Sequence, residues 1–204
     1  MSESLIMHTG GMVATNGYIL GTGEEYFVID APRGIYEVMK SKGIKPTALL
    51  LTHQHYDHIE DAYLFSEAGI PIYAYQQYSP PLVLKEQAER WGFNVKINPF
   101  NVSDEINSKE IISVGQSSIV VLHVPGHSPD SIVYYFAGKQ YLFSGDTLFN
   151  KSIGRSDLPF GDPQVLLNGI TSKLMTLENS VEVFPGHGEP TSIGEERIGN
   201  PFIR

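Results

Sequence analysis

The chain has 204 residues, of which 41% are hydrophobic and 18% are charged, a composition typical of a folded globular protein rather than a disordered one. A formal net charge of −9, with no cluster of Lys and Arg, argues against a surface for nucleic acid or anionic membranes. The chain has no cysteine, which excludes disulfides, thiolate metal ligands and a cysteine nucleophile.

No Pro/Gly/Ser-rich linker, low-complexity tract or internal repeat divides the sequence, so a single domain over residues 1–204 is predicted. The N-terminal segment Met1–Leu5 lacks the basic and apolar stretches of a secretory signal. No apolar run reaches the roughly 18 residues that a transmembrane helix needs. We therefore expect a cytoplasmic protein with neither a nucleic-acid nor a membrane partner.

The first third of the chain predicts the order strand, strand, helix, strand. β-branched and aromatic residues favour the strands, and the helix follows Pro32 and stops at Gly43. The last strand is a continuous apolar run, typical of a strand buried on both faces. These predicted elements are the strands 13–20 and 26–29, the helix 35–42 and the strand 47–52.

The middle of the chain predicts two helices that end at Gly69 and Gly92, and the second half returns to strands. The predicted helices are 59–68, 82–91 and 163–177, and the predicted strands are 72–74, 111–114, 118–124, 131–136, 140–144 and 181–184. Two blocks of strands interleaved with helices indicate an α/β protein with two packed sheets and helices outside them.

The segment His53-Gln54-His55-Tyr56-Asp57-His58 places four potential metal ligands directly after the apolar run 48–51. Side chains alternate along an extended chain, so His53, His55 and Asp57 are expected to project to one side. His58 is expected to join them from the first turn of the following helix. Imidazoles and a carboxylate suit Zn²⁺, Fe²⁺ or Mn²⁺.

Three later segments share one design, in which a predicted strand is followed by a glycine and then by a potential ligand. They end in Gly126-His127, Gly145-Asp146 and Gly186-His187. Glycine at a strand end permits a sharp turn and a close approach of the backbone to an ion. A structural turn explains one such segment equally well, whereas the group of them predicts a metal site.

The complete set of five histidines and two aspartates exceeds what one tetrahedral ion needs. It fits two divalent ions that share a carboxylate, with zinc as the expected metal and iron or manganese as alternatives. Such a pair can hold a bridging hydroxide, lower the pKa of its parent water and polarise a substrate oxygen. This chemistry needs neither a cysteine nor a serine nucleophile.

The same residues, in this order, resemble the signature of the metallo-β-lactamase superfamily. The resemblance implies an αββα sandwich of two mixed β-sheets with helices on the outer faces. It implies that His53, His55 and His127 hold one ion, that Asp57, His58 and His187 hold the other, and that Asp146 bridges both. Asp146 and Asp57 would then be the catalytic carboxylates, acting with a metal-bound hydroxide.

Within that superfamily, the absence of cysteine argues against the true zinc β-lactamases. The segments 144–149, 154–155 and 184–191 resemble glyoxalase II, the hydroxyacylglutathione hydrolases, in a short form without the C-terminal glutathione-binding domain. Arg155 corresponds to a lysine that grips the glutathione of the long enzymes, and a guanidinium can hold a carboxylate with two hydrogen bonds. A loop arginine paired with Asp157 or Asp162 is the competing interpretation.

The expected activity is hydrolysis of a small acyl-thiol such as S-lactoylglutathione by attack of the bridging hydroxide. A persulfide dioxygenase with a single Fe²⁺ is the alternative, because its relatives share a segment like Gly154–Asp157. Lactone or phosphoester hydrolysis and a metal-storage protein without turnover are further alternatives. The sequence leaves open the natural substrate, the metal and the oligomeric state.

Several polar residues near the motifs have no single interpretation. Asp30 is interpreted either as a residue that orients a metal-binding histidine or as a plain turn aspartate. Glu60, Asp61 and Asp130 replace residues that are often glycine in relatives, and their roles stay open. His8 and His123 are not expected to be ligands.

Overall fold

The computed structural model describes residues 4–107 and 109–203, so the first three residues of the segment Met1–Leu5 lie outside it. The backbone forms two compact units, one of Met1–Asn107 with Val114–Gln116 and one of Ser108–Ser113 with Ser117–Arg204. The single domain that the sequence predicts for residues 1–204 stays a prediction. Within the described ranges, no helix is both long and apolar enough to cross a bilayer.

The first unit is built on a six-stranded mixed sheet in the order β1-β2-β3-β4-β5-β6. β1 to β3 are antiparallel neighbours, whereas β3 to β6 run parallel. The strands are β1 Ser4–Gly10, β2 Thr15–Thr22, β3 Glu25–Ile29, β4 Ala48–Leu50, β5 Ile72–Ala74 and β6 Asp104–Glu105. β1 and β6 were not predicted.

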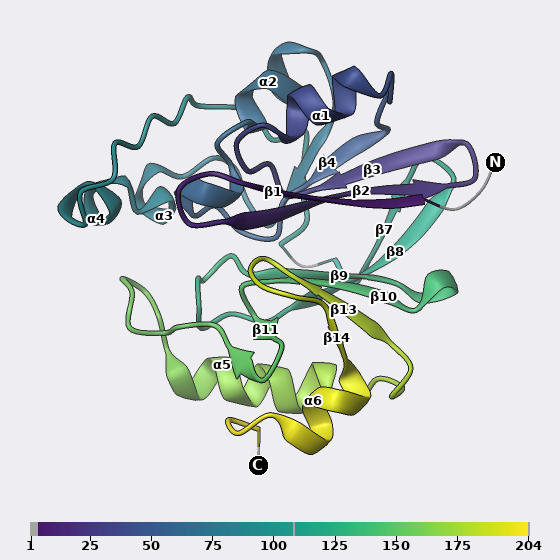
Figure 1. The fold of residues 1–204 in the computed structure, drawn as a ribbon, viewed down its shortest axis with the longest axis vertical. Coiled ribbons are helices and arrows are strands. Elements are labelled where there is room, and N and C mark those ends of the chain that lie inside the picture. Colours follow the sequence, from purple (N-terminus) through teal and green to yellow (C-terminus); the bar gives the residue numbers. More distant parts are fainter. Residues whose placement is uncertain (1–3, 108, 204) are drawn as a thin grey trace. The chain divides into compact units, whose positions relative to one another are not determined.

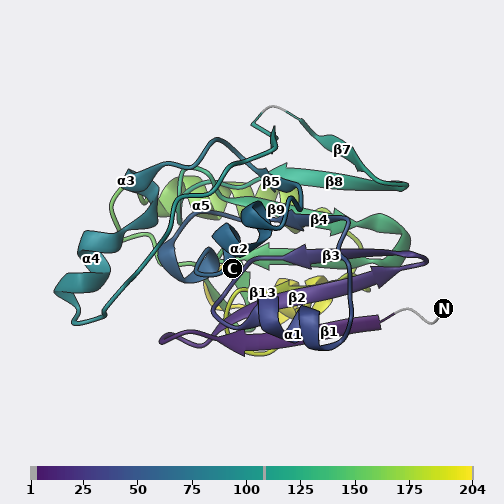
Figure 2. The same cartoon turned by 90° about the horizontal axis from the view of Figure 1, so that it is seen from above.

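Helices α1 (Ile35–Ser41) and α2 (Ala62–Glu67) lie over one face of this sheet (Figures 1 and 2). Their buried side chains Met39 and Phe65 pack in one core with Val28 and Leu49 from the sheet. All four apolar residues at 48–51 are completely buried, which confirms the prediction of a strand buried on both faces.

The helix predicted over 82–91 is wrong as a single element. It consists of α3 (Pro80–Val83) and α4 (Lys85–Arg90), separated at Leu84, whose φ is 55°. This left-handed conformation is unfavourable for leucine and has no local signal. The Leu84 side chain is buried, so tertiary packing overrides the helical pattern.

The second unit contains a six-stranded mixed sheet in the order β14-β13-β10-β9-β8-β7. β10 and β13 are parallel neighbours, and β8/β9, β9/β10 and β13/β14 are antiparallel. The strands are β7 Ile111–Val114, β8 Ser117–His123, β9 Ile132–Phe136, β10 Tyr141–Gly145, β13 Glu182–Pro185 and β14 Thr191–Ser192. A separate hairpin consists of β11 (Leu148–Phe149) and β12 (Ser152–Ile153). Two mixed sheets with helices confirm the predicted fold class.

Helices α5 (Pro163–Gly169) and α6 (Ile193–Gly199) lie on the same side of this sheet (Figure 1). Asp162 starts α5 by accepting hydrogen bonds from the backbone N–H groups of Gln164 and Val165. The helix predicted over 163–177 is too long as a regular α-helix, because α5 passes into a π-helical turn, η3 (Ile170–Leu174). α6 was missed, although Ser192 with Glu195 three residues later has the spacing of a capping box.

Candidate metal centre

In the first unit, the four predicted ligands lie directly after β4. His53 and His55 are in the loop, and Asp57 and His58 are in a short 3-10 turn, η1 (Tyr56–His58). All four residues are at most 6% exposed. The expectation that Asp57 continues an extended alternation and His58 begins the next α-helix is wrong, because both belong to the tighter turn.

Asp30 orients His58. Asp30 Oδ2 accepts a hydrogen bond from His58 Nδ1 at 2.8 Å, and Asp30 Oδ1 accepts one from the Thr52 backbone N–H at 2.7 Å. With its proton on Nδ1, the imidazole of His58 carries its lone pair on Nε2, the atom that can bind a metal ion. Of the two interpretations of Asp30, the structure therefore supports the orienting role.

Thr52 gives His53 the same tautomer as His58, with the proton on Nδ1. The Thr52 hydroxyl donates its single proton to Asp30 Oδ2 at 2.8 Å, so towards His53 Nδ1, 3.1 Å away, it can only accept. His53 Nδ1 is then the donor, and its lone pair also lies on Nε2. Sequence reasoning missed Thr52, although it directly precedes the histidine motif.

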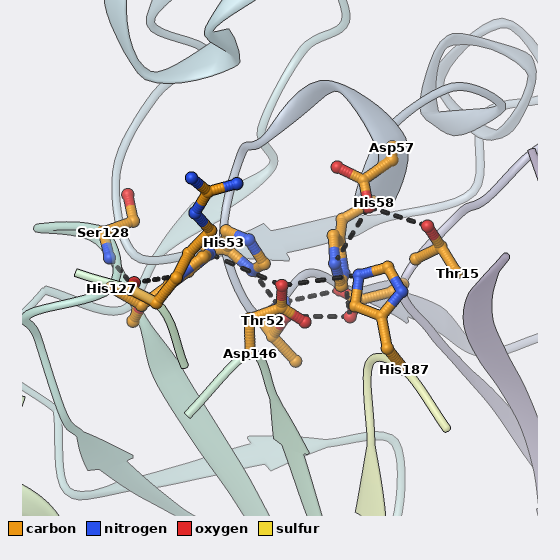
Figure 3. A network of polar contacts seen from close by, with 12 residues as sticks. Thr15, Thr52, His53, Asp57, His58, His127, Ser128, Asp146 and His187 are labelled. Carbon is orange, nitrogen blue, oxygen red and sulfur yellow. Dashed lines mark hydrogen bonds and ion pairs between the residues drawn. The ribbon is translucent and has the colours of Figure 1, made fainter. Parts of the chain in front are cut away.

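The carboxylate of Asp57 is held from β2. Thr15 Oγ1 donates to Asp57 Oδ2 at 2.7 Å (Figure 3). The same oxygen lies 3.4 Å from His58 Nε2. Sequence reasoning missed Thr15 as well, and no motif marks it.

In the second unit, the predicted ligands again follow strand ends. His127 comes four residues after β8, Asp146 directly after β10, and His187 two residues after β13. The sharp turn predicted at the strand-end glycines is confirmed at Gly126 and Gly145, whose φ angles are 125° and 49°, whereas Gly186 has no positive φ.

His127 is oriented by the backbone. Its Nδ1 lies 2.8 Å from the Arg155 carbonyl oxygen, and because a carbonyl only accepts, Nδ1 carries the proton and Nε2 the lone pair. Asp146 Oδ2 lies 3.5 Å from His127 Nε2 and 3.4 Å from His187 Nε2. Figure 3 draws Asp146 with both histidines.

The Asp–His spacings distinguish ligand pairs from hydrogen-bonded pairs. The Asp30–His58 hydrogen bond is 2.8 Å long, whereas the Asp57–His58, Asp146–His127 and Asp146–His187 pairs are 3.4 to 3.5 Å apart. Two ligands about 2.0–2.2 Å from one ion in tetrahedral geometry are separated by about 3.4 Å. The donor set and its spacing therefore fit divalent metal ions.

Arg155 is paired with Asp157. Its Nε and Nη2 donate to the two oxygens of Asp157, both at 2.8 Å, and both side chains are exposed. These hydrogen bonds lower the pKa of Asp157 to about 2. Asp162 caps α5 instead, so of the two predicted acidic partners the structure selects Asp157.

The three acidic residues of open role have contacts within their own units. Glu60 forms an ion pair with Arg33 at 2.8 Å, and burial raises the pKa of Glu60. Asp61 Oδ2 accepts from the backbone N–H groups of Gly34 and Tyr36. Asp130 accepts a short hydrogen bond from Ser128.

The two remaining histidines contact the backbone. His8 Nε2 lies 2.9 Å from the Arg33 carbonyl oxygen, and His123 Nε2 lies 2.8 Å from that of Pro129. Because a carbonyl only accepts, Nε2 carries the proton in both neutral rings and the lone pair lies on Nδ1. The expectation that neither residue is a metal ligand stays a prediction.

Comparison with known sequences gives a family and named relatives. A family model described as "Metallo-beta-lactamase superfamily" matches residues 10–187. The chain is 34% identical over 201 residues to the Bacillus subtilis protein called probable metallo-hydrolase YqgX, covering 95% of this chain and 94% of that one. It is 37% identical over 159 residues to a Haemophilus influenzae protein called hydroxyacylglutathione hydrolase GloC, covering 76% and 74% of the two chains.

Solved structures give a consistent result. The structure called BLEG-1 B3 metallo-beta-lactamase matches with a TM-score of 0.89 and 31% identity, covering 98% of this chain and 99% of that chain. The structure of TTHA1623 in a di-iron-bound form matches with a TM-score of 0.85 and 34% identity, covering 97% and 99%. The fold of this chain is therefore the fold of these proteins.

Proposed function

The chain belongs to the metallo-β-lactamase superfamily of metallo-hydrolases, and on this basis we propose that it hydrolyses the thioester of a small acyl-thiol such as S-lactoylglutathione. The observation that carries the metal-dependent part is Asp146, whose Oδ2 lies at the spacing of a shared ligand from two imidazoles. The substrate class is supported by 37% identity to a relative called hydroxyacylglutathione hydrolase.

The proposed centre uses the seven residues of the predicted ligand set. His53, His55 and His127 would hold the first divalent ion, Asp57, His58 and His187 the second, and Asp146 would be shared. Its assembly is part of the proposal and is supported by the family model, which spans residues 10–187 and thus every proposed ligand. Zinc is the proposed metal, with iron or manganese as alternatives that the same ligands accept; one similar structure is called di-iron-bound.

When bound, such ions make a nucleophile from water near neutral pH and polarise the substrate carbonyl. The protein positions the side chains that would bind the ions. Asp30, Thr52 and the Arg155 carbonyl place a proton on Nδ1 of His58, His53 and His127, and so leave the lone pair of each imidazole on Nε2. Asp57 and Asp146 add the negative charge that two divalent cations require.

Arg155 is the proposed substrate-binding residue. Its two donating nitrogens already engage a carboxylate, that of Asp157, in the bidentate geometry that a substrate carboxylate would use. A substrate carboxylate would therefore compete with Asp157 for the guanidinium. This competition predicts weak affinity for acidic substrates compared with an unpaired arginine.

A persulfide dioxygenase with one Fe²⁺ is the second candidate, favoured by the segment Gly154-Arg155-Ser156-Asp157. Oxygen uptake with glutathione persulfide and one iron per chain would distinguish it. A similar structure is called a B3 metallo-beta-lactamase. A β-lactam therefore joins a lactone and a phosphoester in the substrate panel.

The deciding experiment is S-lactoylglutathione hydrolysis by the purified, metal-loaded protein beside Asp146→Asn. Residues that only orient ligands change activity about 10–100-fold, so loss of the shared ligand should lower turnover more than about 100-fold. Glu182→Gln, an exposed carboxylate of β13 in the same unit, is the matched control and should retain full turnover. Metal content is measured for all three proteins.

Two results would contradict the proposal in different ways. A wild-type protein with two ions and no thioester turnover would exclude the substrate class and leave the metal centre standing. Full turnover by Asp146→Asn with unchanged metal content would exclude Asp146 as a shared ligand that the reaction requires.

A further inference from the structure

Thr15 and Asp57 form a buried contact between two distant parts of the first unit. Thr15 is the first residue of β2 and is completely buried, and Asp57 lies 42 positions later and is 6% exposed. The hydroxyl of Thr15 donates to Asp57 Oδ2 at 2.7 Å. Figure 3 shows this bond beside the contact from Asp57 to His58.

The oxygen that Thr15 contacts is the one at ligand spacing from a histidine. Asp57 Oδ2 lies 3.4 Å from His58 Nε2, the nitrogen that Asp30 leaves with a lone pair. A carboxylate oxygen has two lone pairs. Because one of them accepts the Thr15 proton, rotation of the carboxylate is restricted, with Oδ2 held at this distance from His58 Nε2.

The Thr15 hydroxyl is itself held in place. Its backbone pairs with Gly10 at the end of the β1–β2 hairpin, and in the adjacent pair Thr9 Oγ1 donates to Asn16 Oδ1 at 2.8 Å. A β-branched side chain has few χ1 rotamers, so a fixed backbone also fixes the hydroxyl.

The turn of this hairpin packs against the segment that follows His58. A Cβ added at Gly11 would lie 2.5 Å from Glu60 Oε2, so the turn touches the Glu60 carboxylate directly. Arg33 holds that carboxylate with an ion pair of 2.8 Å. The hairpin that carries Thr15 and the turn that carries Asp57 are therefore fixed to each other at more than one point.

We propose that Thr15 is a positioning residue that sets the affinity of the Asp57–His58 position for its metal ion. The inference rests on the ligand set of the proposed function, but not on the thioester substrate. A residue that orients a ligand typically changes metal affinity by about 10–100-fold. Loss of the hydroxyl should therefore weaken one ion by this factor and leave the ion held by His53 and His55 unchanged.

The test compares Thr15→Val, which replaces the hydroxyl by a methyl group, with Thr15→Ser, which keeps it. Each full-length protein is loaded with Zn²⁺ and dialysed against a chelator series, and bound zinc per chain is measured. Thr15→Val should retain one ion at chelator concentrations where the wild type and Thr15→Ser retain two. Thr15→Ala provides the same comparison if valine crowds Asp57.

Thr9→Val is the matched control, because it removes the neighbouring hydroxyl of the same hairpin, which contacts Asn16 rather than a ligand. Thermal unfolding of the metal-free proteins shows any general loss of stability. An equal loss of zinc in Thr9→Val, an unchanged second ion in Thr15→Val, or a wild type that binds one ion only would each overturn the inference. A wild type with two ions but no thioester turnover would remove only the proposed substrate.

Discussion

Replacing Asp30 by Asn is the sharpest test of how the first unit prepares its ligands. Asp30 has a φ of 56°, a conformation that asparagine also adopts readily, so the change adds no backbone strain. The amide oxygen of the asparagine can still accept a hydrogen bond from the Thr52 N–H. The amide nitrogen then faces His58 Nδ1, which can accept only if the imidazole proton moves to Nε2.

The expected magnitude follows from the bonds that are lost. Hydrogen bonds to a charged group contribute about 1.5–3 kcal/mol each, and the buried carboxylate Oδ2 accepts two of them, from His58 and from Thr52. We expect the free energy of unfolding of the metal-free protein to fall by at least about 1.5 kcal/mol. Because Nε2 would be protonated, we expect zinc affinity to fall about 10–100-fold, equivalent to about 1.4–2.8 kcal/mol.

The assays are chelator competition for zinc affinity, urea unfolding for stability, and nitrogen NMR of the histidine rings for the tautomer. Asp61→Asn is the matched control in the same unit. Asp61 Oδ2 accepts both of its backbone hydrogen bonds, so an amide oxygen in that place keeps them. Burial already raises the pKa of Asp61. Replacing its carboxylate by a neutral amide should therefore change the free energy of unfolding little.

Two results would refute this reasoning about Asp30. One is a wild-type, metal-free protein in which His58 carries its proton on Nε2. The other is an Asp30→Asn protein that binds zinc as tightly as the wild type while showing the altered tautomer.

Three further predictions concern the second unit. Gly154→Ala should lower bound zinc and the melting temperature, because a Cβ there would lie 1.9 Å from the Asp146 backbone oxygen; normal zinc content would contradict this. Asp157→Asn should release Arg155 and lower KM for thioesters that carry a carboxylate, with kcat unchanged. With a pKa of about 2, below its ordinary value, Asp157 keeps this pair at every pH above about 4, so the KM difference should not depend on pH between 5 and 9. Burial lowers the pKa of His123 in the folded protein, so the unfolded chain binds a proton at this residue more readily. The free energy of unfolding should therefore fall as pH drops below about 6.5. His123→Gln should make this pH dependence weaker in urea unfolding.

The strands and the ligand types were readable from the sequence because their signals are local. The strands 72–74 and 111–114 have the predicted bounds. The apolar run 48–51 and the histidine motif after it are recognisable from a few consecutive residues. The glycines before His127 and Asp146 were readable for the same reason, since glycine is the residue that adopts a positive φ most easily.

Local patterns failed where packing altered the backbone. The break at Leu84 and the π-helical turn after Gly169 interrupt sequences with good helical spacing. A Cβ at Gly169 would lie 2.8 Å from Val124 Cγ1, so this helix comes close to the end of β8. Helical spacing contains no information about such a close approach, which is a property of the packed unit.

The sequence by itself determined which side chains can bind metal ions, because imidazole and carboxylate chemistry belongs to the residue and the strand-end pattern to its neighbours. Only the tertiary structure decided which ring nitrogen of His58 carries the lone pair and which oxygen of Asp57 lies near it. Asp30 and His58 are 28 positions apart, and Thr15 and Asp57 are 42. Their hydrogen bonds form because β2, β3 and β4 are neighbours in one sheet, and strand register over such separations has no local signal in the sequence.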